Sequence, residues 1–389
     1  MSQTTTTPPR ERAVQGFARA FGVQPQQLSR APARVNLIGE HTDYNEGYAM
    51  PCAIDRDTVV AAAPRDDDVV EVLACDLDGA SARFRVDDAS DVAGSPQWVR
   101  YVQGMVAVLR ERGLPVRGAQ LAIAGNVPQG AGLSSSASLE LAVGQALASL
   151  NGWQLAPRAM ALAGQRAENA YAGCQCGVLD QMSSALGVAG HALLLDCRSL
   201  DVQPIPLPAN TAVLVIDSKI QRGLVDSEYN LRRQQCEAAA AGLGVKALRD
   251  VDDDLWSRRG GTLDLVVRRR ARHIITDSRR CELMADAMRQ GDLPAIGRLM
   301  RESHWSMRDD FEITVPAIDA LAALVQGVIG DAGGARMTGG GFGGCVIALA
   351  PVGQVDEIRA AVAAGYRSPQ GREAEVHVCA ASHGAGSLA

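Results

Sequence analysis

Apolar and polar positions along the chain follow two periodicities, which predict strands and helices mixed throughout. Apolar runs bounded by turn residues predict strands at 30–43, 57–63, 69–75, 191–200 and 211–218. Helical spacing predicts helices at 98–110, 157–173, 228–244 and 279–307. Residues 1–12 are expected to form a disordered tail before a short amphipathic helix through Phe17 and Phe21. Because both halves mix the two kinds of element, the pattern favours an α+β fold.

Two glycine-rich segments interrupt this pattern in different ways. Residues 118–152 predict a strand, a glycine loop and a helix in direct succession, and the helix is expected to end at Asn151 with Gly152 beyond it. Near the end of the chain, the glycine loop at 339–344 runs straight into an apolar strand.

The length of the chain predicts two domains. It has 389 residues, and domains usually run about 100–200 residues. Since no linker-like segment marks the boundary, we place it near residue 200, which gives domains of 1–200 and 201–389.

Composition and charge narrow the class of protein. A net charge of -6 leaves no basic footprint for nucleic acid or an anionic membrane. No apolar run approaches the roughly 18 residues that a membrane helix needs, and the polar N-terminal segment predicts no secretory signal. Nine scattered cysteines without CxxC pairs indicate reduced thiols, and Cys174 with Cys176 lacks the second pair or nearby histidine that zinc needs. We therefore expect a cytoplasmic protein.

The segment "PQGAGLSSSAS", residues 128–138, is the strongest local signal. Gly130 and Gly132 allow close approach of the backbone to a ligand. The three serines 134–136 then lie at the first turn of a helix, where unpaired N–H groups favour an anion and hydroxyls suit phosphate or Mg²⁺. The segment lacks the lysine of a Walker A loop. The alternative is an ordinary serine N-cap.

The loop "GGGFGG" at 339–344 loosely matches a dinucleotide-binding pattern. That pattern requires a strand before the glycines and a helix after them, whereas a strand follows here, so the context excludes it. A ligand-contacting loop and a purely structural turn both remain open.

Polar residues elsewhere also allow more than one interpretation. Asp180 lies between apolar residues just after Gly177, as a helix cap or as a functional base. Glu168 lies among polar neighbours on a helix, where most such residues face water. The segment "RVNLIGEHTDYNEGY" at 34–48 brings an arginine, acids and a histidine to the end of a buried strand, as a site or as a surface salt network.

Together these segments resemble a known family. "RVNLIGEHTDYNEGYAMP", "PQGAGLSSSAS" and "RMTGGGFGGCVIAL" are similar to the three motifs of the GHMP small-molecule kinases, and the first is similar to that of galactokinases. "GVLDQMSSALG", "HALLLDCRSL", "SEYNLRRQQCE" and "MRDDFEITVPAID" extend the resemblance along the chain. Ala33 and Met50 depart from the usual glycine and leucine, and neither change removes a reacting group.

The resemblance implies a fold and an activity. The fold would be the two-domain GHMP kinase fold, with an N-terminal mixed sheet like that of ribosomal protein S5, a C-terminal antiparallel sheet, helices on both, and an active site in the cleft between the domains. The activity would be transfer of the γ-phosphoryl group of ATP to the C1 hydroxyl of α-D-galactose. The resemblance implies Mg²⁺ as cofactor and galactose and ATP as partners, and a monomer is expected.

The resemblance also assigns residues to roles. Asp180 would be the catalytic base and Arg34 its partner, which would also offset charge on the phosphoryl group. Sugar binding is implied for Glu40, His41, Thr42, Asp43, Gly177 and Tyr229. ATP binding is implied for Trp98, Gly130, Ala131, Gly132, Leu133, Ser134, Ser135 and Ser136, and Mg²⁺ binding for Ser136 and Glu168. For Trp98, packing in the core is the alternative.

Two other functions share this resemblance. Some galactokinase-like proteins are ligand sensors that coactivate transcription, but those lack two residues of the "SSSA" segment, which is intact here at 134–137. A GHMP kinase for N-acetylgalactosamine would need a wider pocket at the sugar C2, which the sequence leaves open.

Overall fold

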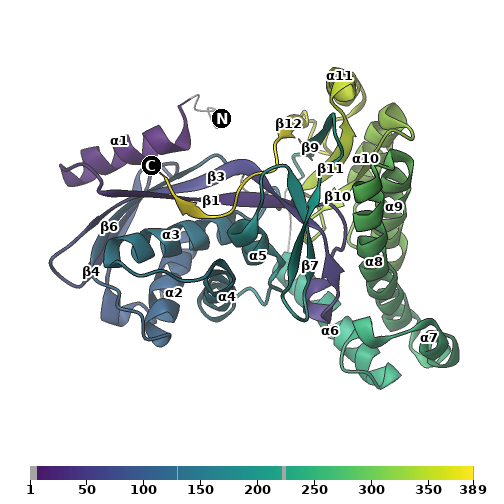
Figure 1. Ribbon diagram of the computed structural model, residues 1–389, viewed down its shortest axis with the longest axis horizontal. Coiled ribbons are helices and arrows are strands. Elements are labelled where there is room, and N and C mark those ends of the chain that lie inside the picture. The colour runs from purple at the N-terminus through teal and green to yellow at the C-terminus, as the bar shows by residue number, and fades with distance from the viewer. Residues whose placement is uncertain (1–6, 129, 221–224, 389) are drawn as a thin grey trace.

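The computed structural model describes residues 7–128, 130–220 and 225–388, arranged as two α+β halves side by side (Figure 1). The N-terminal half and the segment that follows it contain α1 (Pro9–Phe21), β1 (Gln27–Asn36), β2 (Tyr48–Ala49), β3 (Pro51–Pro64), β4 (Val69–Ala74), β5 (Ala80–Arg85), α2 (Gln97–Glu111), β6 (Ala119–Gly125), α3 (Ser135–Asn151), α4 (Pro157–Ala167), α5 (Leu179–Leu186), β7 (His191–Asp196) and β8 (Val202–Pro206). The C-terminal half contains β9 (Thr211–Asp217), α6 (Val225–Leu243), α7 (Asp253–Arg259), α8 (Leu265–Gln290), α9 (Leu293–Ser306), α10 (Pro316–Ile329), β10 (Gly334–Thr338), β11 (Cys345–Pro351), α11 (Val355–Gly365), β12 (Glu375–Cys379) and β13 (Gly386–Ser387).

The N-terminal half is built on a mixed six-stranded sheet, in the order β13-β1-β3-β6-β4-β5, in which β4 and β6 are parallel. Side chains of β3 alternate between its two faces, as the strand period requires. Val59 and Ala61 belong to the buried cluster that includes Phe17 of α1, and Val60 and Ala62 belong to the cluster that includes residues of α2 and α3. Figure 1 shows α1 on one side of the sheet and α2 and α3 on the other. Because both faces are covered by helices, β3 is apolar over much of its length.

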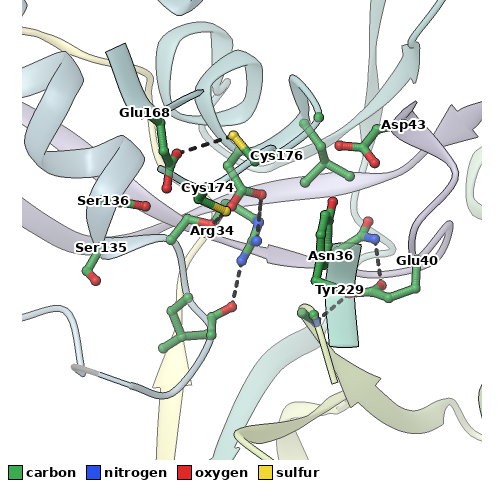
Figure 2. A pocket seen from close by; sticks show the side chains of 18 of the residues that line it. Arg34, Asn36, Glu40, Asp43, Ser135, Ser136, Glu168, Cys174, Cys176 and Tyr229 are labelled. Atoms are coloured by element: carbon green, nitrogen blue, oxygen red, sulfur yellow. Dashed lines mark hydrogen bonds and ion pairs between the residues drawn. The ribbon is translucent and has the colours of Figure 1, made fainter. Parts of the chain in front are cut away.

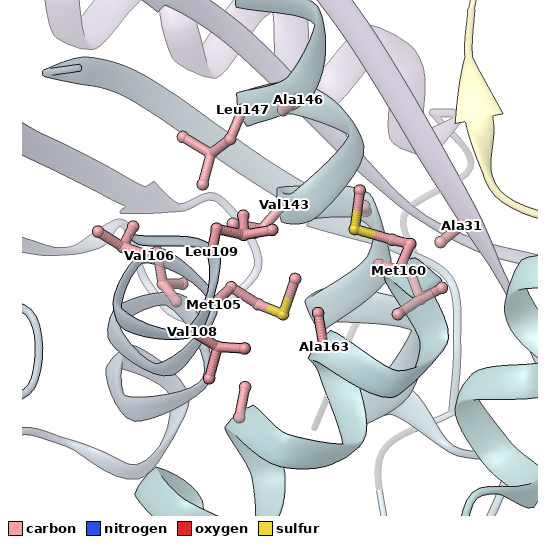
Figure 3. Packing of buried hydrophobic residues seen from close by; sticks show 14 of the residues in the cluster. Ala31, Met105, Val106, Val108, Leu109, Val143, Ala146, Leu147, Met160 and Ala163 are labelled. Carbon is pink, nitrogen blue, oxygen red and sulfur yellow. The ribbon is translucent and has the colours of Figure 1, made fainter. Parts of the chain in front are cut away.

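A cluster of buried hydrophobic residues in the N-terminal half holds helix α3 in place. Met105 and Leu109 of α2 and Met160 of α4 pack against Val143 in this cluster (Figure 3). Gly144 makes room for them, since a Cβ there would lie 2.6 Å from the sulfur of Met160. Dense packing of this kind leaves little freedom for rearrangement, so the N-terminus of α3 has a fixed position.

The C-terminal half is built on an antiparallel four-stranded sheet in the order β10-β11-β9-β12, and α8, α9 and α10 cover it (Figure 1). A smaller sheet, β2-β7-β8, lies beside it. The end of the chain returns to the N-terminal sheet, where β13 pairs with β1 through Ser387 opposite Ser29. These sheets confirm the expected α+β fold. The domain boundary near residue 200 stays a prediction.

The N-terminal helix begins earlier than predicted. Residues 7–12 are described, and Pro9 opens α1, whereas the sequence suggested a tail through residue 12. Proline favours the first turn of a helix because it needs no N–H partner there. Residues 1–6 lie outside the described part of the chain.

The helix predicted at 279–307 was wrong in its limits. The structure has two helices instead, and the first begins at Leu265. Gly291 ends α8 in the left-handed conformation, and the Asp292 carboxylate accepts from the N–H of Ala295 to begin α9. Both are ordinary stop and start signals.

The described part of the chain contains neither a membrane-spanning helix nor a disulfide. Within those residues, no helix is both long enough and apolar enough to cross a membrane. All nine cysteines lie there as well, and none of them forms a disulfide.

Candidate active site

The first motif forms a loop that begins where β1 ends, and contacts from the C-terminal half hold it. The Asp277 carboxylate on α8 accepts from the N–H groups of Gly39 and Glu40, both at 3.1 Å. The Thr42 hydroxyl donates to the carbonyls of Gly39 and Tyr48, at 2.9 and 2.7 Å. Thr42 is fully buried and does not line the cavity, so its visible role is to shape the loop.

Glu40 is fixed by three groups. Its Oε2 accepts from Asn36 Nδ2 at 2.6 Å and from a guanidinium nitrogen of Arg336 on β10 at 2.9 Å. Its Oε1 accepts from the N–H of Gly339, in the glycine loop of the third motif. Burial raises the pKa of Glu40, and the positive charge of Arg336 opposes that rise. The third motif, which begins with Arg336, therefore positions the carboxylate of the first motif.

Asp43 and Gly177 meet at the same end of the cavity. A Cβ at Gly177 would lie 1.8 Å from Asp43 Oδ2, so any side chain there would displace the carboxylate. Burial, and then the nearby Asp180 carboxylate, raise the pKa of Asp43 to about 6. The His41 ring lies 4.7 Å from that of Tyr229, centroid to centroid, and its Nδ1 lies 2.9 Å from the Tyr44 hydroxyl.

Arg34 and Asp180 form an ion pair at the centre of the cavity. Arg34 Nε donates to Asp180 Oδ1 at 2.7 Å, and Arg34 also donates to the carbonyl of Gly132 at 2.7 Å. Asp180 Oδ2 accepts from the Ser134 hydroxyl. Asp180 lies in the first turn of α5, and its side chain faces these two partners instead of capping the helix.

The serine segment opens α3. Gly130 and Gly132 have φ values of 70° and 78°, and Ser134 has a φ of 60°, which a serine rarely adopts. This conformation directs the Ser134 hydroxyl to Asp180, so the alternative of an ordinary serine cap is not what the structure shows. The first turn of α3, at 135–137, still offers the unpaired N–H groups that favour an anion.

Glu168 lies beside Ser136 at the other end of the cavity. It begins a π-helical turn, Glu168–Ala172, directly after α4, and is buried instead of facing water. Burial, and then the Asp180 carboxylate, raise the pKa of Glu168 to about 7, while a hydrogen bond from Ser136 opposes the rise. A divalent cation would offset this crowding of negative charge, so the donor set fits Mg²⁺. Among the described residues, no three His, Cys, Asp or Glu side chains form a metal-binding group, so such an ion would need further oxygens from a ligand.

These residues surround one cavity of about 260 Å³ between the two halves. Figure 2 shows Ser136 and Glu168 at one end, Glu40 and Asp43 at the other, and Arg34 between them. A second cavity, of about 410 Å³, shares Gly130, Ser135 and Ser136 with the first.

The other residues predicted for the site differ in which cavity they line. Trp98 lines the second cavity and also packs on the core of the N-terminal half, and its contact with adenine stays a prediction. Ala131 is buried and lines neither cavity. The remaining predicted residues in the first cavity are Arg34, His41, Gly132, Leu133, Ser134, Gly177, Asp180 and Tyr229.

The arrangement suits a transfer between two ligands. One end offers fixed hydrogen-bond acceptors, which suits a polyhydroxylated molecule. The other offers a helix N-terminus and a cation site, which suits a polyphosphate. A carboxylate and a guanidinium lie where two such ligands would meet.

Comparison with known proteins identifies the family. The model of the galactokinase galactose-binding signature matches residues 15–64, and those of the GHMP kinase N-terminal and C-terminal domains match 100–188 and 284–368. The chain is 32% identical to the galactokinase of Lactococcus lactis, solved in complex with galactose. That match has a TM-score of 0.91 and covers 96% of this chain and 98% of the other. The chain belongs to the galactokinase family.

Other GHMP kinases share the fold of this galactokinase-family member at greater distance. Mevalonate kinase of Methanococcus jannaschii is 16% identical, with a TM-score of 0.63, over 92% of this chain and 98% of its own. A D-glycero-D-manno-heptose 1-phosphate kinase from Bacteriodes thetaiotaomicron is 14% identical, with a TM-score of 0.62, over 93% and 98%. At these identities the likeness concerns the fold alone. The galactokinase match places the chain among kinases.

Several residues of the site were missed by sequence reasoning. Arg336 and Asp277 hold the loop of the first motif from elements about 240 to 300 positions away, which local patterns do not reveal. Glu140 and Gln181 are buried beside Glu168. For Glu140 a signal existed, because it is the only charged residue of its helix and lies one helical turn after Ser136.

Proposed function

We propose that this protein transfers the γ-phosphoryl group of ATP to the C1 hydroxyl of α-D-galactose and releases galactose 1-phosphate and ADP. The observation that carries the proposal is the meeting of Arg34, Asp180 and the serine-bearing end of α3 around one cavity. Membership of the galactokinase family, with its match to the galactose-binding signature, supports the choice of sugar.

Asp180 is proposed to take the proton of the attacking hydroxyl, or to orient that hydroxyl if the transition state is loose. Its two oxygens already accept from Arg34 and Ser134, but a carboxylate oxygen can accept more than one hydrogen bond. The sugar hydroxyl would therefore add to this set or replace the serine. Arg34 would stabilise negative charge on the transferring group.

Glu40, His41, Asp43 and Tyr229 are proposed to bind the sugar hydroxyls. Rigid acceptors of this kind penalise an absent or misplaced hydroxyl, which gives selectivity. Gly177 would contribute by leaving room for the Asp43 carboxylate.

Residues 130–136 are proposed to bind the phosphates of ATP, with the adenine in the second cavity beside Trp98. Ser136 and Glu168 would hold Mg²⁺, which would neutralise phosphate charge and align the reacting oxygens. The protein supplies the helix N-terminus and Arg34 for the same purpose.

The direct test is an ADP-release assay with ATP, Mg²⁺ and one sugar at a time. Galactose should give fast turnover, and glucose and N-acetylgalactosamine far less. Equal rates with all three sugars would defeat the substrate assignment, and a preference for N-acetylgalactosamine would favour the alternative kinase. Galactose binding without turnover of any sugar would favour a sensor.

Asp180→Asn tests the role of the base. We expect turnover to fall about 10²–10⁴-fold, with the dissociation constant for galactose changed only slightly, as measured by calorimetry. Loss of binding together with turnover would mean that Asp180 acts mainly in recognition.

A further inference from the structure

Gln181 connects two buried acids that lie behind the proposed metal site. It follows Asp180 on α5 and is fully buried. Its Nε2 donates to Glu168 Oε2 at 2.7 Å and to Glu140 Oε2 at 3.1 Å. A primary amide has two N–H groups, so both are engaged and the orientation of the amide is set by the two carboxyls.

Glu140 has no evident part in substrate binding. It is buried on α3, four positions after Ser136 and therefore on the same side of the helix. One of its oxygens, Oε2, accepts from Gln181, and Oε1 has no hydrogen-bond partner among the residues that the structure describes. A buried acid with an unpaired oxygen is costly to keep, which indicates that it serves another group.

The surrounding packing restricts this group of residues. A Cβ at Gly164 on α4 would lie 2.8 Å from Leu141, 3.2 Å from Gln181 and 3.3 Å from Glu140 Oε2. Helix α4 therefore lies close against α3 and α5 at this point. Little room is left for Gln181 to turn away from the two acids.

The position of Glu168 explains why such support is needed. Its backbone lies in a five-residue π-helical turn, whose geometry is less regular than that of the preceding helix. The amide of Gln181 links this turn to α5, which carries Asp180. Through Glu140 it also links the turn to α3, which carries Ser136.

We propose that Gln181 and Glu140 are positioning residues that hold the Glu168 carboxylate in the orientation required to bind Mg²⁺ with the nucleotide. This inference rests on the proposed function, because it assigns Glu168 to the metal. It predicts that the pair affects metal-dependent nucleotide binding and leaves sugar binding at the other end of the cavity intact.

The experiment measures ADP binding by calorimetry over a series of Mg²⁺ concentrations, without turnover. Gln181→Met keeps the approximate volume but removes both donors, and we expect about a tenfold rise in the Mg²⁺ concentration for half-maximal ADP affinity. Galactose affinity should stay within twofold of the native protein. Glu140→Gln keeps an acceptor for Gln181, so its Mg²⁺ dependence should stay near that of the native protein. Glu140→Met removes the acceptor, so its Mg²⁺ dependence should change in the same way as that of Gln181→Met.

The matched control is Gln103→Met, which removes another buried glutamine whose Nε2 donates at 3.2 Å to the carbonyl of Asp91. It should lower stability without changing metal dependence. If Gln181→Met does not fold, Gln181→Asn replaces it, because the shorter amide cannot reach both acids. Native metal dependence in the Gln181 variant, or equal loss of galactose and ADP binding, would overturn the inference. If ADP binding by the native protein were independent of Mg²⁺, the proposed metal site itself would fail.

Discussion

The two ends of the cavity differ in how their charges are compensated. At the end proposed to bind sugar (the sugar end), Glu40 is buried but accepts from Arg336, Asn36 and the N–H of Gly339. At the end proposed to bind phosphate and Mg²⁺ (the phosphate end), Glu168 and Glu140 are buried with amide and hydroxyl donors, and neither has a cationic partner among the residues that the structure describes. Glu40 at the sugar end thus has its cationic partner within the protein, whereas the acids of the phosphate end would gain one only with the proposed Mg²⁺.

Under the proposed function, this difference indicates how each end would achieve selectivity. Fixed acceptors favour the one arrangement of sugar hydroxyls that matches them, because the protein does not move to form the hydrogen bonds. Two buried carboxylates that repel each other have little affinity for phosphate alone, and they bind it only together with a divalent cation. Four changes to the protein or its conditions, ordered from the largest expected effect to the smallest, test this difference between the two ends.

The first prediction concerns Arg336→Met at the sugar end. Removing the cation leaves Glu40 buried without its charged partner, which should cost about 3–5 kcal/mol of stability and abolish measurable galactose binding. Urea denaturation and calorimetry measure the two effects. Arg359→Met, on the exposed face of α11, is the control and should be silent. The double variant with Glu40→Gln should recover stability but not sugar binding. An unchanged galactose affinity in Arg336→Met would show that the sugar end does not depend on this cation.

The second prediction concerns Glu168→Gln at the phosphate end. The pKa of Glu168 is about 7, against an ordinary 4.5, so between these pH values the folded protein holds a proton that the unfolded chain has lost. Stability of the ligand-free protein should therefore fall as pH rises through this window, by up to about 3 kcal/mol. Glu168→Gln should remove the contribution of Glu168 to this slope, leave that of Asp43 below about pH 6, and raise the stability at pH 8 while weakening Mg²⁺-dependent ADP binding.

Thermal unfolding at pH 5 and pH 8 measures that slope. Glu357→Gln, an exposed acid on α11, should leave the slope unchanged. A Glu168→Gln protein that is less stable than the native protein at pH 8 would show that the phosphate end is not strained by its charge.

The third prediction concerns the pH dependence of galactose binding. The pKa of Asp43 is about 6, and its ionised form is the better acceptor for sugar hydroxyls. The dissociation constant should therefore rise about tenfold as pH falls from 7 to 5. Asp43→Asn should bind more weakly and with most of this dependence removed. A flat profile in the native protein would contradict the role of Asp43 as a charged acceptor.

The fourth and smallest prediction concerns Trp98→Leu. Loss of the aromatic surface beside the second cavity should raise KM for ATP about fivefold, which corresponds to about 1 kcal/mol. KM for galactose should not change. Trp305→Leu removes a half-exposed tryptophan of α9 and serves as the control. Equal effects on both substrates would place the adenine elsewhere.

The sequence predicted those parts of the site that depend on neighbours along the chain. Gly130 and the serines of 134–136 form a continuous motif, and its residues lie together because they are adjacent. Arg336 was missed because its contact with Glu40 spans 296 positions and no local pattern marks a buried arginine. The break between α8 and α9 was readable in Gly291 and Asp292, but the apolar periodicity on either side concealed it.

The return of β13 to the N-terminal sheet has a consequence for synthesis of the protein. Ser387, which pairs with Ser29, is translated only after both halves of the fold have been made. Domains generally fold as the chain emerges from the ribosome, yet here the outer edge of β1 stays uncovered opposite Ser29 until β13 has been made. Unpaired strand edges attract other strands. The newly made chain therefore passes through a period in which the ribosome still holds the strand that protects its first sheet.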